Sequence, residues 1–238
     1  MGILAKTLSF ITIIFYGSSA YSQEERLAPR PVILELFTSQ GCSSCPPADK
    51  VLEYYAENNP NVIALSMHVD YWNYIGWRDP FSSNEITQRQ RNYQLALQRR
   101  NVYTPQMIID GKYQGIGSRY NKINPIVGKA LTKTKDVPIS LSVNNNKLEV
   151  GIKPHSPGQK EDADIVIIGY DRKKHTKITR GENSGESLTN VNVVRYIKNI
   201  GKYNGSKIDL KSDIPDTDDF VVILQNSGQK EIIGVGVL

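Results

Sequence analysis

Cysteine and histidine are both scarce in this chain of 238 residues, which has two cysteines and three histidines. Cys42 and Cys45 cannot complete a metal site by themselves, because a structural zinc ion takes four ligands. Further ligands would have to come from His68, His155 or His175. Neither cysteine lies near the N-terminus, which argues against the attachment of a lipid there.

Long hydrophobic runs are also missing after the first twenty residues. The single early run, Leu8–Tyr16, follows Lys6 and is too short to cross a membrane comfortably. Small residues at 18–20 then fit a signal-peptidase site, so residues 1–22 are predicted to be a signal peptide. An uncleaved membrane anchor is the alternative. Export would deliver the mature chain, without a transmembrane segment, to the periplasm or the medium, where disulfides persist.

A concentrated positive charge is absent as well. The net charge of +5 comes from Lys and Arg residues spread along the chain, apart from Arg99-Arg100 and Arg172–Lys174. Scattered charge is typical of an ordinary solvated surface, so no nucleic-acid partner is expected. The chain has no repeat or low-complexity tract, and its 39% of apolar residues fits a globular protein.

The first half of the chain predicts alternating strands and helices. Pro31–Phe37 and Val62–Val69 are short apolar runs typical of buried strands, and a helix begins between them at Pro46-Pro47. This order predicts two parallel strands joined by a right-handed crossover. The later elements are expected to be a helix from a capping box of Ser82 and Glu85 to about Arg100, a strand at 106–109, a hairpin turn at Asp110-Gly111, a strand at 112–116 and a helix at 124–133.

The second half predicts strands alone. Ile139, Leu141 and Val143 alternate with serine, and the alternation resumes after Asn144–Asn146, which indicates a hairpin. Further strands are expected at 164–170, 192–197, 220–224 and 232–237. We therefore predict an α/β domain at residues 28–135 and a β-rich C-terminal domain at 136–238 that packs against it.

Cys42 and Cys45 have the spacing of a redox pair, since thiols at positions i and i+3 at the start of a helix can open and close a disulfide. The positive end of the helix favours the thiolate, which is the nucleophile. We expect Cys42, just before the helix, to be the more exposed and more reactive, attacking thiol and Cys45, nearer the helix, to be the resolving thiol. A static structural disulfide and a copper or zinc site formed by Cys42, Cys45 and His68 are the alternatives.

A strand, a C-x-x-C pair at a helix start, a second strand and Thr104-Pro105 before a third strand together resemble the thioredoxin fold. The resemblance implies a thioredoxin-like α/β domain, a mixed sheet flanked by helices, with a cis peptide bond at Thr104-Pro105 that faces Cys42 and binds the substrate backbone. Glu35, an acid in an apolar strand, is similar to the buried acid of thioredoxins and DsbA-like oxidases, which moves protons for the resolving thiol. An edge or outward-facing glutamate is the alternative. No cofactor beyond a redox-active Cys42–Cys45 disulfide is implied.

A closer resemblance is to a family of exported bacterial proteins with a thioredoxin-like fold and no settled function. It is carried by the residues Glu35–Asp49, His68–Asn73, Gly76-Trp77, Tyr103–Gln106, Arg180–Gly185 and Asn192–Arg195. The chain departs from thioredoxin itself, because no tryptophan precedes Cys42, Ser43-Ser44 separates the thiols and the prolines follow the pair. The intervening dipeptide tunes the reduction potential, so thioredoxin's value cannot be assumed.

Polar and aromatic residues after the second strand complete the candidate site. His68 and Asp70 lie at the edge where α/β folds place ligands, although His68 is alternatively a hydrogen-bonded structural residue. Trp72 and Trp77 either cover the redox site as a lid or peptide-binding surface or belong to the core. The sequence thus predicts an exported thiol–disulfide oxidoreductase that acts on protein thiols or disulfides and has a redox partner. A metal-handling protein and a non-catalytic binding module are the rival functions.

Overall fold

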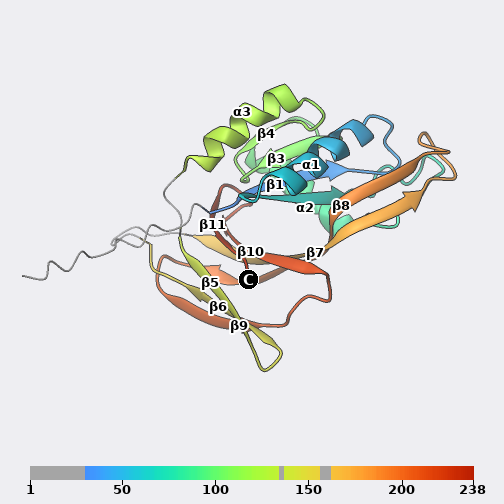
Figure 1. Ribbon diagram of the computed structural model, residues 1–238. Coiled ribbons are helices and arrows are strands. Elements are labelled where there is room, and N and C mark those ends of the chain that lie inside the picture. The colour runs from blue at the N-terminus through green and yellow to red at the C-terminus, as the bar shows by residue number, and fades with distance from the viewer. Residues whose placement is uncertain (1–29, 134–136, 156–161) are drawn as a thin grey trace, which may run out of the picture.

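The computed structural model describes residues 30–133, 137–155 and 162–238 (Figure 1). The predicted signal peptide and the predicted domain boundary between residues 135 and 136 lie outside these ranges. The elements in chain order are β1 (Val32–Thr38), α1 (Pro46–Asn58), β2 (Val62–His68), α2 (Asn84–Ala96), β3 (Gln106–Ile109), β4 (Tyr113–Ile116), α3 (Tyr120–Leu131), β5 (Ile139–Asn144), β6 (Lys147–Ile152), β7 (Ala163–Lys177), β8 (Ser187–Tyr203), β9 (Ile208–Ser212), β10 (Asp219–Asn226) and β11 (Ile232–Gly236). Within the described ranges, no helix has the length and apolar character needed to cross a membrane.

Eight of these strands form one mixed sheet in the order β11-β10-β7-β8-β2-β1-β3-β4. β1 and β2 are parallel, as the crossover predicts, and β3 runs antiparallel beside β1. β8 joins β2 at Ser66 and Val193, so strands of the second half continue the sheet of the first half. The other three strands form a separate antiparallel sheet in the order β5-β6-β9. The second half, strands alone in its described residues, therefore extends the first sheet as well as packing against it.

Three apolar cores hold these layers together. α1 and α3 cover one face of the large sheet and α2 covers the other (Figure 1). Side chains alternate along β1, so Leu34 and Leu36 pack against α1, whereas Ile33 and Phe37 pack against α2. The small sheet packs on β7 and β10 through a third core. All seven residues of β1 are buried, which gives the candidate site after this strand a rigid base.

The predicted helices are present, but their ends differ from the prediction. The cap of α2 is Ser83, whose hydroxyl accepts the Ile86 N–H, so the predicted capping box at Ser82 is wrong by one residue. The same helix ends at Ala96 rather than near Arg100, because Gln98, the residue after the C-cap Leu97, adopts a positive φ of 51°. α3 begins one turn earlier than predicted and includes Pro125, which the sequence prediction placed near its start.

The turns and strands of the sheet were predicted with mixed success. Asp110 and Gly111 both have positive φ, 50° and 64°, which confirms the hairpin between β3 and β4. β9 was missed. β7 and β8 have 15 and 17 residues and pair over nearly their whole length, far beyond the predicted strands. Their outer part forms an arm that projects from the sheet (Figure 1), and its polar residues hid it from the sequence prediction.

Candidate functional site

Cys42 and Cys45 form a disulfide in the loop between β1 and α1, with their Cα atoms 5.4 Å apart. Cys45 is the N-cap of α1, and Pro46 and Pro47 are its first two residues. Proline has no N–H, and the next two N–H groups, of Ala48 and Asp49, both donate to Cys45 O at 2.8 and 3.1 Å. The first turn therefore has no unused N–H group that could stabilise a thiolate directly.

Both cysteines are buried, with 1% of Cys42 and 0% of Cys45 exposed. The two exposed fractions hardly differ, so the prediction that Cys42 is the more exposed sulfur gains little from the structure. One cover is the aromatic loop, residues 70–83, which packs on the chain at Gly41. A Cβ atom at Gly41 would lie 3.3 Å from both Trp72 and Ile75, so the close fit depends on glycine.

Two hydroxyl groups lie against the sulfur of Cys42. The Thr104 hydroxyl donates to Cys42 Sγ at 3.3 Å, and Ser44 Oγ lies 3.4 Å from the same sulfur. Trp72 Nε1 donates in turn to Thr104 Oγ1 at 2.8 Å. The Thr104-Pro105 peptide bond is cis, as the sequence predicted. The structure thus brings Thr104 and Trp72, two of the predicted substrate-binding residues, to the attacking side of the pair.

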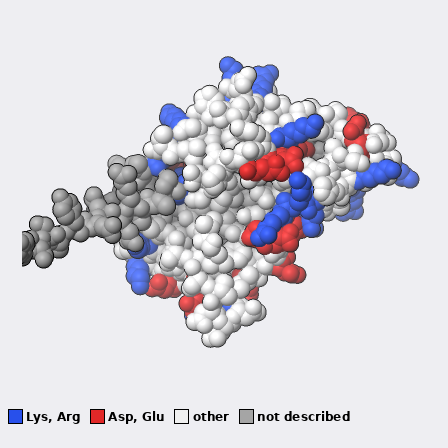
Figure 2. All heavy atoms as spheres, viewed as in Figure 1, with Lys and Arg blue, Asp and Glu red and all other residues white. Residues whose placement is uncertain are grey.

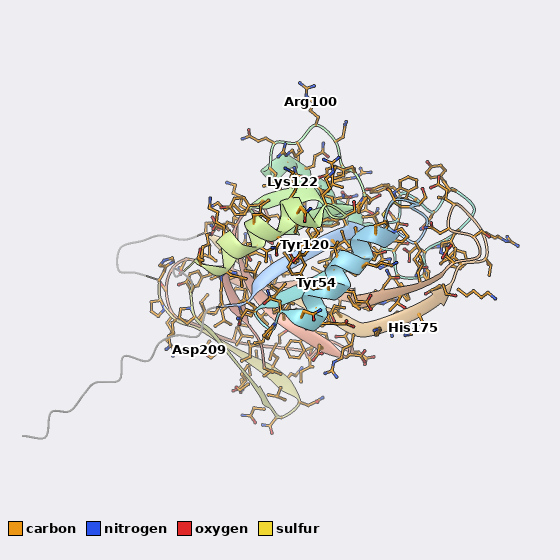
Figure 3. All side chains as sticks on the ribbon, turned by 45° about the horizontal axis from the view of Figure 1, so that its top comes forward. Tyr54, Arg100, Tyr120, Lys122, His175 and Asp209 are labelled. Carbon is orange, nitrogen blue, oxygen red and sulfur yellow. A yellow bond between two sulfur atoms is a disulfide. The ribbon has the colours of Figure 1, made fainter. Side chains whose placement is uncertain are left out.

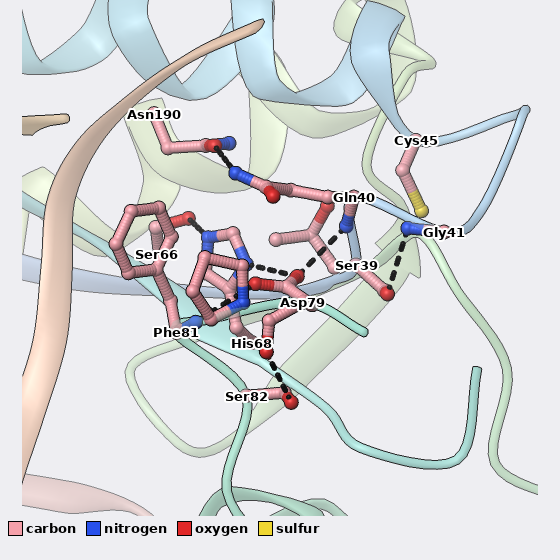
Figure 4. A network of polar contacts seen from close by, with 12 residues as sticks. Ser39, Gln40, Gly41, Cys45, Ser66, His68, Asp79, Phe81, Ser82 and Asn190 are labelled. Atoms are coloured by element: carbon pink, nitrogen blue, oxygen red, sulfur yellow. Dashed lines mark hydrogen bonds and ion pairs between the residues drawn. The ribbon is translucent and has the colours of Figure 1, made fainter. Parts of the chain in front are cut away.

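Behind the cysteine loop lies a buried polar network (Figure 4). Asp79 Oδ2 accepts the Gln40 N–H at 2.8 Å and lies 2.7 Å from His68 Nδ1, and Asp79 Oδ1 accepts the Phe81 N–H at 2.9 Å. Burial raises the pKa of Asp79, but the contact with His68 and the donated hydrogen bonds outweigh it and hold the pKa below its usual value. The Gln40 side chain is fixed on both sides, by Trp77 Nε1 at 3.2 Å and by Asn190 at 3.2 Å.

This network has the hydrogen-bond order of a hydrolase triad, because Ser66 Oγ lies 3.1 Å from His68 Nε2. Ser66, His68 and Asp79 are each at most 2% exposed, so all three side chains lie inside the fold. His68 contacts Ser66 and Asp79 on its two ring nitrogens, so its predicted role in substrate binding gains no support and stays a prediction, whereas these contacts agree with the alternative of a hydrogen-bonded structural residue. Asp70 likewise anchors α2, since its carboxylate accepts the Thr87 hydroxyl at 2.6 Å.

A metal site at the cysteines finds no support in this arrangement. Both ring nitrogens of His68 are within hydrogen-bond distance of other side chains, and the two sulfurs are joined to each other. In the described parts of the chain, no three His, Cys, Asp or Glu side chains converge in a way that could hold a metal ion. His175 lies on the β7–β8 arm, where Figure 3 labels it, and its Nδ1 lies 2.8 Å from Thr189 Oγ1.

Asp49, which the sequence interpretation did not consider as an acid, supplies a buried carboxyl on α1, on the face of the sheet that α1 covers. It lies one helical turn after Cys45 on α1, and its carboxylate accepts the Thr38 hydroxyl at 2.9 Å. Burial raises the pKa of Asp49 to about 6, against the opposing effects of His68 and Thr38. The available signal was its spacing, because residues at i and i+4 share a face of a helix.

Glu35 lies on the opposite face of the sheet from α1. Its neighbour Leu36 faces α1, so the alternation of the strand turns Glu35 toward α2. There it is buried and forms an ion pair with Arg89, whose Nη2 donates at 3.0 Å, and accepts the Tyr93 hydroxyl. The structure therefore does not bring Glu35 to the cysteines, and its predicted role in proton transfer gains no support.

The tip of the β7–β8 arm contacts the cysteine loop. We call residues 178–186, between β7 and β8, the hairpin tip. Asn183 Nδ2 donates to Gln40 O at 2.8 Å and to Cys42 O at 3.1 Å. The Glu182 carboxylate accepts the Ser43 N–H at 3.2 Å. The sequence marked these polar residues but gave no reason to place them at the cysteines.

The molecular surface shows no concentration of one charge on the face in Figure 2, where Lys and Arg side chains alternate with Asp and Glu. One such pairing links the arm to α1, because Lys173 Nζ lies 3.3 Å from Glu53 and 3.5 Å from Glu57. This distribution agrees with the scattered charge seen in the sequence.

The comparisons with known proteins place the chain in a family without giving it an activity. Residues 33–225 match the model of a family described as "Protein of unknown function (DUF1223)". A protein of Agrobacterium tumefaciens solved by X-ray crystallography is similar, with 31% identity, a TM-score of 0.75 and coverage of 89% of this chain and 95% of that one. HBP35 of Porphyromonas gingivalis shares the fold, with a TM-score of 0.62, 14% identity and coverage of 87% and 74%. A search of the curated proteins gives no match.

Proposed function

Because the chain belongs to the DUF1223 family, whose function is unknown, its activity has to be argued from the site, and we propose that it is an exported thiol–disulfide oxidoreductase. Its redox group is the Cys42–Cys45 pair, and its substrates are protein thiols or disulfides. The observation that carries the proposal is the disulfide at the start of α1, beside the cis Thr104-Pro105 bond and the Thr104 hydroxyl. The order β1-α1-β2, then the cis proline, β3, β4 and α3, supports a thioredoxin-like domain.

In the reducing direction, the Cys42 thiolate attacks one sulfur of a substrate disulfide. A mixed disulfide forms, the substrate S–S bond breaks, and the other substrate sulfur leaves as a thiolate that takes up a proton. The Thr104 and Ser44 hydroxyls, at 3.3 and 3.4 Å from Cys42 Sγ, stabilise the attacking thiolate by donating hydrogen bonds. These hydroxyls replace the helix N–H groups that the two prolines and Cys45 O remove from use.

The second step needs a proton acceptor for Cys45. The Cys45 thiol loses its proton and attacks Cys42 Sγ, the mixed disulfide breaks, and the second substrate sulfur leaves as a thiol. Two electrons have then passed to the substrate. Asp49 is the acceptor that we assign, because it is buried one turn from Cys45 and its pKa of about 6 suits a group that takes and returns a proton near neutrality.

The pair is poorly placed to act only as a structural staple. A disulfide stabilises mainly by restricting the unfolded chain, and the effect grows with the length of the loop that it closes. Cys42 and Cys45 are separated by three positions, so the constraint is small. The neighbouring hydroxyls and buried acid serve sulfur chemistry and add nothing to such a staple.

Trapping of mixed disulfides tests this proposal in cells that export the protein. Cys45→Ser leaves Cys42 able to attack but without the thiol that releases its partner. We therefore expect mixed-disulfide complexes with other proteins that a reductant cleaves. Cys42→Ser is the matched control, because it removes the attacking sulfur. Absence of complexes with Cys45→Ser, or equal trapping by both variants, would contradict the assignment of Cys42 as the nucleophile.

A further inference from the structure

The loop that carries the disulfide, which the proposed function requires to react, is contacted by two segments distant in sequence, the aromatic loop and the hairpin tip. With 1% of Cys42 and 0% of Cys45 exposed, a second sulfur has no open path to either of them. We propose that the hairpin tip is a gate, and that thiol–disulfide exchange at Cys42 requires the tip to move away first. This inference rests on the proposed function and assigns a role to the second half of the chain.

The hairpin tip holds the backbone of the cysteine loop directly. The Asn183 amide donates to Gln40 O at 2.8 Å and to Cys42 O at 3.1 Å, and so bridges the two sides of Gly41. The Glu182 carboxylate accepts the Ser43 N–H at 3.2 Å. Three hydrogen bonds thus fix the backbone of residues 40–43, the stretch that carries the attacking sulfur.

The tip also presses on the aromatic loop, which is the other cover of the disulfide. A Cβ atom at Gly181 would lie 3.1 Å from Trp77 Cβ and 3.3 Å from Ile75 O, so the two segments touch without a gap. Ile75 in turn packs on Gly41. The tip therefore clasps the aromatic loop onto the cysteine loop, and its release loosens both covers together.

The tip is built to open locally. Gly181 and Gly185 have φ of +78° and +94°, a backbone conformation that glycine adopts without strain. Apart from Ile178 and Asn183, the tip residues are exposed or half-buried. The arm behind the tip stays anchored in two ways. Lys173 of β7 forms an ion pair with Glu53 of α1, and Asn190 and Val191 of β8 are buried. The tip is held to the cysteine loop by polar contacts at its surface and not by a large apolar core, so we expect it to open at a lower free energy than the buried strands.

Reduction of the purified, oxidised protein by dithiothreitol measures this gate without a protein substrate. A dithiothreitol thiolate attacks Cys42 Sγ, the Cys42–Cys45 bond breaks and Cys45 leaves and is protonated. The second dithiothreitol thiol then releases the Cys42 thiol and closes its own disulfide. If opening precedes attack, the observed rate levels off at high dithiothreitol concentration, where it equals the rate of opening.

Asn183→Ala removes the bridge to Gln40 O and Cys42 O, so we expect reduction about tenfold faster, as the loss of one to two hydrogen bonds implies. Asn101→Ala is the matched control, because Asn101 is exposed in the connection between α2 and β3, and its rate should equal that of the wild type. Glu182→Ala, at an exposed position, provides a second variant with a smaller acceleration that decides the question if Asn183→Ala does not fold.

A rate that rises in proportion to dithiothreitol at all concentrations and is unchanged in Asn183→Ala and Glu182→Ala would overturn the gate. That result leaves the redox activity itself standing, since an ungated pair can still exchange disulfides. A gated pair that traps no partner in cells would instead contradict the proposed function alone. The two claims therefore fail separately.

Discussion

His68 Nδ1 lies 2.7 Å from Asp79 Oδ2, and the same carboxylate oxygen accepts the Gln40 N–H two residues before Cys42. A histidine at the end of β2 therefore determines, through one carboxylate, where the chain enters the cysteine loop. Both side chains are 0% exposed, so this contact is part of the buried frame of the loop. The cysteine loop is consequently held at Gln40 N by the His68–Asp79 pair and at Gln40 O and Cys42 O by the hairpin tip.

Asp79→Asn should destabilise the protein by about 3–5 kcal/mol at neutral pH, because it breaks a buried pair and places an amide NH₂ against N–H donors. The folded-state pKa of Asp79 is lowered, so its stabilisation is present above the unfolded pKa of about 4 and is lost as pH falls through the folded pKa. Urea denaturation should show a gap between wild type and variant that narrows below about pH 4. A gap independent of pH would contradict this role.

Asp49→Asn should have the opposite pH dependence. The pKa of Asp49 is raised to about 6, so the folded state favours the protonated acid, and the associated stability is present below about pH 4 and lost as pH rises through 6. The asparagine still accepts the Thr38 hydroxyl but carries no charge. Relative to wild type, the variant should gain about 2–3 kcal/mol between pH 4 and pH 7 in urea denaturation. If the difference in the free energy of unfolding between variant and wild type stays the same from pH 4 to pH 7, burial does not raise the pKa of Asp49.

Ser44→Ala should raise the pKa of the Cys42 thiol by about one unit, because it removes a hydroxyl 3.4 Å from the sulfur. Destabilising the thiolate disfavours the reduced form, so the reduction potential should become about 30 mV more negative. Ultraviolet absorbance of the thiolate against pH gives the pKa. Ser43→Ala is the matched control in the same dipeptide, since Ser43 contacts Glu182 through its backbone N–H. Equal shifts of the Cys42 thiol pKa in both variants would show that the Ser44 hydroxyl does not stabilise the thiolate.

Glu35→Gln tests the correction to the sequence interpretation. The variant breaks a buried ion pair with Arg89, so we expect a loss of about 3–5 kcal/mol in the free energy of unfolding. The thiol pKa and the reduction potential should stay unchanged, because Glu35 faces α2 on the other side of the sheet. A change in the rate at which Cys45 resolves a mixed disulfide would restore the proton-transfer role that the sequence suggested.

The first half of the fold followed from the sequence because its signals are local. Apolar runs mark β1 and β2, paired prolines mark the start of α1, and Asp110-Gly111 marks its turn. The sequence interpretation considered only Glu35 as the buried acid and missed Asp49. A single position along β1 reverses the face of the sheet that a side chain occupies, and composition alone does not reveal which face carries α1.

The enclosure of the disulfide was beyond the reach of the sequence. Asn183 lies 141 positions from Cys42, and their contact depends on the pairing of β8 with β2 and on the full length of the arm. The outer part of the arm is held together by backbone hydrogen bonds between β7 and β8. Its side chains are mostly exposed or half-buried, so the sequence there is polar and lacks the apolar run of a buried strand. Neither periodicity nor spacing predicts a contact made at the end of such an arm.

The reduction potential of the Cys42–Cys45 pair tests the central claim most directly. Equilibration of the full mature chain with defined mixtures of oxidised and reduced glutathione, or of dithiothreitol, measures it. An exchanging pair is expected between about −270 and −120 mV, the interval between thioredoxin and the strongly oxidising DsbA. A value below about −300 mV would mark a structural disulfide and contradict the proposed oxidoreductase.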